Sequence, residues 1–160
     1  MCNRLNKYDH YYGAFLSKVL DNGNRPALMK KDEGRGIYKL ATDKSQEDYL
    51  VYMKYVSNKK GDNLWNFNFT DSNLIEIEEL LKTESLIFGL IGSYKSLNGT
   101  EIAIVSKDEF LQCIDFNCSR NKNQRLSVLK IKHSNKLYIY GTFLDRDDAI
   151  AIKRYRINEL

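Results

Sequence analysis

The chain has 160 residues, 42% of them hydrophobic and 29% charged, a composition that predicts one globular domain and excludes an intrinsically disordered chain. The net charge is +4, but it is segregated: residues 71–115 carry nine acidic and three basic side chains, whereas residues 116–160 carry ten basic and four acidic ones. This asymmetry favours an anionic partner or a partner subunit.

The first predicted element is a helix over Lys7–Leu20, whose apolar residues recur at helical spacing. Gly23 follows it and can take the left-handed conformation that ends helices. After a polar stretch, three strands are predicted over Ile37–Thr42, Leu50–Val56 and Trp65–Phe69. The loop between the last two strands is short, polar and contains glycine, which predicts that they pair as a hairpin.

The Trp65–Phe69 strand alternates aromatic residues with asparagines, which predicts an aromatic core face and an amide face. A helix capped by Asp71 or Ser72 is expected next, with its leucines and isoleucine facing inward. Leu86–Gly92 is predicted to be a buried strand that pairs with Thr100–Val105.

Ser106 and Glu109 have the spacing of a capping box and predict a short helix. Strands near Leu126–Lys132 and Leu137–Phe143 follow as a hairpin, and residues 150–157 form either a final strand or an arm.

These elements predict an α+β fold with a mixed central sheet and about three helices. We expect residues 1–160 to form a single domain, with residues 1–6 and 144–160 flexible or peripheral.

The order helix, three strands, helix, strand over residues 7–92 resembles the core of the PD-(D/E)XK nucleases, the restriction-endonuclease-like fold. In that family an acid on one strand and Glu/Gln-x-Lys on the next hold a divalent metal. One register places Asp48 at the acid and Asn66–Asn68 at the triplet. A second places Asp43 at the acid and Tyr52–Lys54 at the triplet, where tyrosine replaces the carboxylate. The resemblance implies a nuclease-like fold without metal-dependent cleavage.

The pattern Tyr-x-Lys-Tyr at residues 52–55, followed by Trp-x-Phe-x-Phe at residues 65–69, is also similar to that of a group of small prokaryotic proteins. This second resemblance implies no particular activity.

Lys54 lies among apolar residues, where an unpaired ammonium is costly. It either contacts phosphate or acts in catalysis, or its ammonium reaches solvent at the strand end. With a histidine such as His10 and a tyrosine such as Tyr52, it would suit metal-independent RNA cleavage, in which a 2′-hydroxyl is the nucleophile. The candidate catalytic residues are therefore Lys54, Tyr52, Asp48 and His10.

The C-terminal hairpin interleaves basic and aromatic residues. A three-residue loop would place Lys132 opposite Tyr138 and Lys130 opposite Tyr140. Such a face suits phosphate neutralisation and base stacking, although lysine and tyrosine also populate ordinary solvated sheet faces. The candidate nucleic-acid-binding residues are Lys130, Lys132, Tyr138, Tyr140, Arg125 and Lys136.

The three cysteines match no metal-binding spacing, so we expect reduced thiols, no metal site and no cofactor. No apolar run approaches the roughly 18 residues that a membrane span needs, and we expect no signal peptide. The sequence therefore predicts a cytoplasmic protein that does not bind a membrane.

Three functions remain open at this stage. The first is a nucleic-acid-binding, nuclease-like accessory protein without metal-dependent cleavage, in a microbial DNA-defence or DNA-processing system. The second is a metal-independent RNA-cleaving enzyme. The third is a protein-interaction subunit or inhibitor that docks through the acidic middle segment, with a protein partner or a second copy of the chain.

Overall fold

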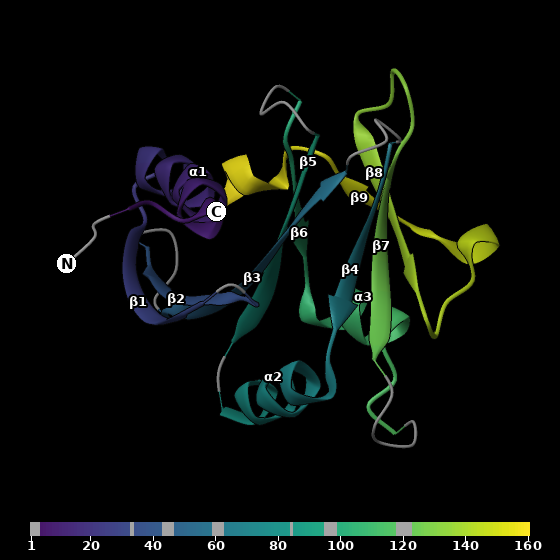
Figure 1. Cartoon of the computed structure of the whole chain (residues 1–160), viewed down its shortest axis with the longest axis horizontal. Coiled ribbons are helices and arrows are strands. Elements are labelled where there is room, and N and C mark those ends of the chain that lie inside the picture. The colour runs from purple at the N-terminus through teal and green to yellow at the C-terminus, as the bar shows by residue number, and fades with distance from the viewer. Residues whose placement is uncertain are drawn as a thin grey trace.

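The computed structural model describes residues 4–32, 34–42, 47–58, 63–83, 85–94, 99–117 and 123–160 (Figure 1). It is an α+β fold with three α-helices, as the sequence predicts. The elements in chain order are α1 (Lys7–Asp21), β1 (Arg25–Lys31), β2 (Gly36–Ala41), β3 (Tyr49–Asn58), β4 (Leu64–Phe69), α2 (Asp71–Thr83), β5 (Leu86–Tyr94), β6 (Glu101–Val105), α3 (Lys107–Cys113), β7 (Gln124–Lys130), β8 (Lys136–Gly141), η1 (Arg146–Asp148), β9 (Ile150–Lys153) and η2 (Arg156–Glu159), where η marks a 3₁₀ helix.

The strands form two sheets. The five-stranded sheet has the order β1-β2-β3-β5-β6, in which β3 and β5 are parallel and the other neighbours antiparallel. The four-stranded sheet has the order β4-β7-β8-β9 and is antiparallel throughout. The predicted pairing of β5 with β6 is confirmed, and so is the mixed character of the larger sheet.

The predicted hairpin between β3 and β4 is wrong. The chain leaves the five-stranded sheet after β3, and β4 pairs with β7, so that Trp65 lies opposite Val128. The strand that carries Lys54 is flanked by β2 and β5. The aromatic face of β4 is buried as expected, but it packs against the other sheet. Gly92 on β5 makes this possible, because a Cβ there would lie 2.6 Å from the Trp65 ring.

Strand β1 is not predicted by the sequence pattern. All of its residues except Pro26 are exposed, and it pairs with β2 alone. An edge strand with no buried face carries no period-two pattern, and proline and lysine are typical of edges that are protected from further pairing.

The molecule has three layers (Figure 1). Helix α1 covers one face of the five-stranded sheet, where Tyr12, Phe15 and Val19 pack with residues such as Val51 and Met53. The other face packs against the four-stranded sheet, and this core holds the aromatic residues of β4 together with Phe88 and Phe110. Figure 1 shows α2 lying across the open end between the two sheets, below β3. Within the described residues, no helix is both long and apolar enough to cross a membrane.

The helix caps follow their sequence signals. The Ser106–Glu109 capping box is present at the start of α3, as predicted. Helix α2 begins at Asp71, and the Thr70 hydroxyl accepts a hydrogen bond from the Asn73 backbone N at 3.2 Å. The capping side chain is therefore Thr70, and not the predicted Asp71 or Ser72.

The end of the chain is tied to the rest of the fold. Residues 150–153 form β9, the edge strand of the smaller sheet. Beyond it, Ile157 is buried, and the Arg156 guanidinium donates to both carboxylate oxygens of Glu109, at 2.7 and 3.0 Å.

Candidate functional site

Lys54 lies on the face of β3 that looks toward the smaller sheet, and only 9% of it is exposed. Its ammonium does not extend to solvent at the strand end. It donates to Asn73 Oδ1 at 2.9 Å, at the start of α2, and lies 5.2 Å from the centre of the Phe69 ring. Burial lowers the pKa of Lys54 to about 8, since a low-polarity environment disfavours the charged amine.

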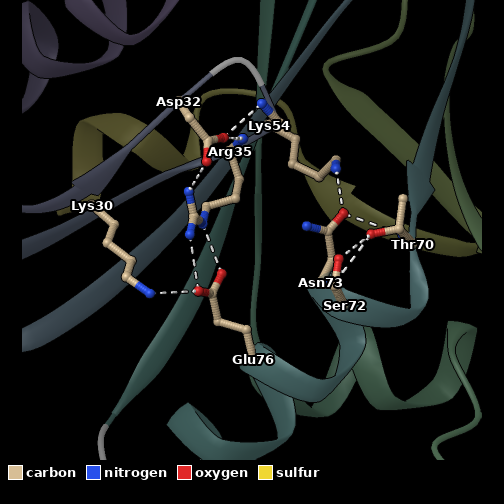
Figure 2. A network of polar contacts seen from close by, with 9 residues as sticks. Lys30, Asp32, Arg35, Lys54, Thr70, Ser72, Asn73 and Glu76 are labelled. Carbon is tan, nitrogen blue, oxygen red and sulfur yellow. Dashed lines mark hydrogen bonds and ion pairs between the residues drawn. The ribbon is translucent and has the colours of Figure 1, made fainter.

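Next to Lys54, Arg35 is clamped between two carboxylates (Figure 2). Its Nε and Nη2 donate to Glu76 at 2.7 and 3.0 Å, and its Nη1 donates to Asp32 at 2.7 Å. Lys30 approaches Glu76 at 3.4 Å. The hydrogen bonds and charge of Arg35 hold the pKa of Glu76 below its usual value. This arrangement joins the β1–β2 turn to α2 by a bidentate ion pair.

Tyr52 shares the buried face of β3 with Lys54 and is fully buried. Within the described part of the chain its hydroxyl has no hydrogen-bond partner. Burial, together with the Glu76 carboxylate, raises the pKa of Tyr52, so the phenol stays protonated.

The structure does not bring the candidate catalytic residues together. Asp48 is exposed and directly precedes β3, whereas Lys54 lies in the middle of that strand. His10 is exposed on α1, which packs on the other face of the five-stranded sheet. Asp43 lies outside the described residues. Within the described ranges, no three His, Cys, Asp or Glu residues group closely enough to hold a metal ion.

The predicted register of the C-terminal hairpin is wrong. Lys130 lies opposite Leu137, and Leu129 lies opposite Tyr138. The chain turns earlier than expected, around residues 131–134, where the backbone N of Ser134 donates to the carbonyl of Ile131 at 3.1 Å. His133 takes a positive φ of 63° there. The shift changes the parity of the pairing, so the lysines and tyrosines do not share one face.

Each predicted nucleic-acid-binding residue therefore has its own environment. Lys130 points to the core side and pairs with Glu101 at 3.1 Å. Tyr138 is half-buried and Tyr140 buried on the opposite face. The other three are exposed: Arg125 on β7, Lys132 in the turn and Lys136 at the start of β8.

Glu101 is the buried centre of a three-residue ion network. Its carboxylate accepts hydrogen bonds from the Arg154 guanidinium and pairs with Lys130, which joins β6 of one sheet to β7 of the other and to the chain after β9. The Glu101 side chain is 7% exposed, and its two partners are about one-fifth exposed.

Beside this network is a surface hollow of about 330 Å³, which we call the basic hollow. It is lined by Asn135, Lys136, Lys153, Arg154, Tyr155 and Glu159. Lys136 and Lys153 lie directly opposite each other on β8 and β9. The Arg154 guanidinium lies 5.1 Å from the centre of the Tyr155 ring, and that ring is largely exposed.

Sequence reasoning singled out Lys136 but missed the other cations of the basic hollow. The signal was the segment Lys153-Arg154-Tyr155, in which two basic residues directly precede an aromatic one. These residues form a site only because β9 pairs with β8. A strand of four residues, two of them exposed, is too short to predict that pairing from the sequence.

Comparisons of this chain with protein-family models, with curated proteins and with solved structures found no match.

Proposed function

We propose that this chain is a nucleic-acid-binding accessory protein of nuclease-like fold, which binds phosphate backbones in the basic hollow and does not cut them by a metal-dependent reaction. A role in a microbial DNA-defence or DNA-processing system fits such a protein. The single observation that carries the proposal is the direct opposition of Lys136 and Lys153 beside the exposed ring of Tyr155.

Like charges that face each other across two strands destabilise a sheet. Lys153 has a surface partner in Glu159 at 2.8 Å, but both side chains are more than half exposed, and such pairs contribute little. Two carboxylates, Glu101 and Glu159, stand against four cations in and beside the hollow: Lys130, Lys136, Lys153 and Arg154. The remaining positive charge suits a bound phosphate chain.

Two further observations support the nuclease-like part of the proposal. The elements that carry the resemblance occur in the expected chain order, α1, β2, β3, β4, α2, β5, although β1 precedes β2 and β4 pairs in the smaller sheet. Tyr52–Lys54 lie on β3, the second of these three strands. Within the described residues, the carboxylates of Asp32 and Glu76, which act on the charges of Lys54 and Tyr52, are both bound by Arg35, so their oxygens are poorly placed to serve as the hard ligands that magnesium needs.

A salt titration with single-stranded and duplex probes tests the proposal. Lys136→Gln and Lys153→Gln should each reduce the slope of log affinity against log salt by roughly 0.7 to 0.9, because each removes one phosphate contact and the counterion that it displaces. Tyr155→Ala should weaken single-strand binding by roughly 1 to 3 kcal/mol and leave the slope unchanged, since stacking involves no counterion release.

The matched control is Lys107→Gln, which removes an exposed lysine on α3 and should leave the slope unchanged. The proposal fails if the double variant Lys136→Gln with Lys153→Gln stays folded and keeps both its affinity and its slope.

A further inference from the structure

The basic hollow holds two cations that can act on the same group. Lys136 and Lys153 are directly opposite each other on β8 and β9, and the Cα atoms of opposed residues on antiparallel strands lie roughly 4.5 to 5.5 Å apart. Both side chains are exposed, and a lysine ammonium sits at the end of a flexible stem. The two ammonium groups can therefore contact the oxygens of a single phosphate.

The positive charge of the hollow is not balanced by the residues that the structure describes. Within that part of the chain, the Lys136 ammonium has no hydrogen bond or ion pair. Lys153 pairs with Glu159, and both side chains are more than half exposed. Together with its direct ion-pair partners, the hollow has four cationic side chains and two carboxylates, a net charge of +2. The aspartates of the β8–β9 connection lie at the other end of these two strands.

A phosphate monoester matches this charge better than a phosphate within a strand does. A monoester has a charge of about −1.5 to −2 at pH 7 and three acceptor oxygens. Each phosphate within a strand is a diester with one negative charge, so it would leave about one positive charge of the hollow uncompensated. The charge of the hollow therefore favours a phosphate at a strand end or on a free nucleotide.

The hollow also has room for a base. Its volume of about 330 Å³ is at the lower end of the roughly 300 to 1,000 Å³ that is typical of small-ligand sites, which suits one nucleotide. The Tyr155 ring lines the hollow and is 58% exposed. A base that stacks on this ring must be unpaired, because the bases of a duplex are already stacked on one another.

We propose that the basic hollow binds a nucleotide that carries a phosphate monoester and an unpaired base, with the phosphate between Lys136 and Lys153 and the base on Tyr155. Such a nucleotide occurs at a phosphorylated 5′ or 3′ end of a single strand, or free as a nucleoside monophosphate. This ligand rests on the proposed function and narrows it, from phosphate backbones in general to phosphorylated ends.

Fluorescence anisotropy with one single-stranded sequence tests the proposal. The strand carries an internal fluorophore and is prepared with a 5′-phosphate, with a 3′-phosphate and with hydroxyl ends. The wild type should bind one of the two phosphorylated strands at least about tenfold more tightly than the hydroxyl strand, because the added dianion accepts charge-assisted hydrogen bonds. A methyl ester of the preferred phosphate should lose most of this gain, since it leaves one negative charge.

Competition experiments separate the sources of the phosphate. A nucleoside 5′-monophosphate, a nucleoside 3′-monophosphate and inorganic phosphate are each titrated against the preferred strand. The nucleotide with its phosphate on the preferred side should displace the strand at a lower concentration than inorganic phosphate does, because its base also stacks on Tyr155.

Two kinds of variant separate the phosphate from the base. The double variant Lys136→Gln with Lys153→Gln should bind phosphorylated and hydroxyl strands alike, whereas Lys107→Gln should keep the preference. Tyr155→Ala should weaken both strands by the same factor, roughly 5- to 150-fold, and Tyr155→Phe should keep the affinity of the wild type. Phe143→Ala removes another exposed aromatic ring, beyond the far end of β8, and should change nothing.

The outcomes distinguish this ligand from the proposed function. If the wild type binds phosphorylated, methylated and hydroxyl strands equally and the double lysine variant weakens all three, the monoester is wrong and the proposed function stands. If inorganic phosphate competes as well as both nucleotides, the base makes no contact and the proposal is overturned. If a nucleoside monophosphate binds but no strand does, the ligand is supported and the proposed function fails. If nothing binds, both fail.

Discussion

The molecule has two groups of cations that differ in where their counter-charges come from. In the Lys54 region, the cations are held inside the fold: Arg35 is bound by two carboxylates, and Lys54 is buried, which lowers its pKa to about 8. In the basic hollow, Lys136 and Lys153 oppose each other and are exposed. The comparison indicates that the ion pairs of Arg35 stabilise the fold, whereas the exposed lysines of the basic hollow, of which Lys153 has, among the described residues, only the surface partner Glu159, are available to a ligand.

Glu101 combines features of both regions. It is a buried carboxylate, and it neutralises Arg154 at the edge of the basic hollow. Glu101→Gln would leave two partly buried cations without their carboxylate, and we expect it to lower the free energy of unfolding by about 3 kcal/mol. Glu159→Gln removes an exposed pair and should cost less than about 1 kcal/mol. Urea denaturation of both variants measures the two changes in the free energy of unfolding. If the two changes are equal, the buried and the exposed carboxylate contribute equally to stability, and the comparison is wrong.

Lys54→Met tests whether the buried amine lowers the free energy of unfolding. The pKa of Lys54 falls from 10.5 to about 8 on folding, so the unfolded chain holds the proton more tightly than the folded one. The cost is fully present below pH 8 and is relieved as the pH rises to 10.5. We expect the variant to exceed the wild type in unfolding free energy by up to about 3 kcal/mol at pH 7.

The pH dependence is the sharper part of that experiment. The stability advantage of Lys54→Met should shrink steadily when denaturation is repeated from pH 7 to pH 9.5. A constant difference across this range would mean that the amine is not desolvated in the folded state, and that Lys54 belongs with the exposed cations.

Arg35→Lys keeps the charge of the clamp but removes its geometry. A lysine cannot make the bidentate contact with Glu76 and the contact with Asp32 at once, and we expect a loss of about 1 to 2 kcal/mol in thermal or chemical denaturation. Lys30→Gln, at a more exposed partner of the same Glu76, should cost less than about 0.5 kcal/mol. If Arg35→Lys leaves the free energy of unfolding unchanged, the positive charge alone, and not the bidentate geometry, stabilises the contact between the β1–β2 turn and α2.

Lys136→Glu has the smallest expected effect on stability, and of the opposite sign. It replaces a repulsive cross-strand pair with an attractive one, and should raise the free energy of unfolding by about 0.5 kcal/mol, while it weakens nucleic-acid binding. A variant that lost both stability and binding would contradict the view that the exposed lysines are kept for a ligand.

Much of the fold could be predicted because its signals are local. The stripe of α1, the capping box of α3 and the apolar run of β5 each specify an element without reference to the rest of the chain. The partner of β4 could not be predicted, because strict alternation says that one face is buried but not against which sheet. Strand β1 has no buried face and so gave no pattern.

The candidate site was harder to predict from the sequence, because it also depends on which distant elements pair with each other. Lys130 looked like a surface lysine because its counter-charge, Glu101, is on another strand of another sheet. The basic hollow exists only once β9 has paired with β8. Lys54 was singled out as unusual, but its hydrogen-bond acceptor, Asn73 Oδ1, lies on α2, and the sequence does not show that this helix packs beside β3.

The departure of β4 from the larger sheet also sets an order of events during synthesis. Asn66 and Ser127, which hydrogen-bond across β4 and β7 at 2.7 Å, are 61 residues apart. At roughly 5 to 20 residues per second, about 3 to 12 s separate their emergence from the ribosome. All strands of the larger sheet precede residue 106, so that sheet can assemble first. Until β7 arrives, the aromatic strand of Trp65, Phe67 and Phe69 has an open edge, and in this interval the nascent chain is most prone to associate with its neighbours.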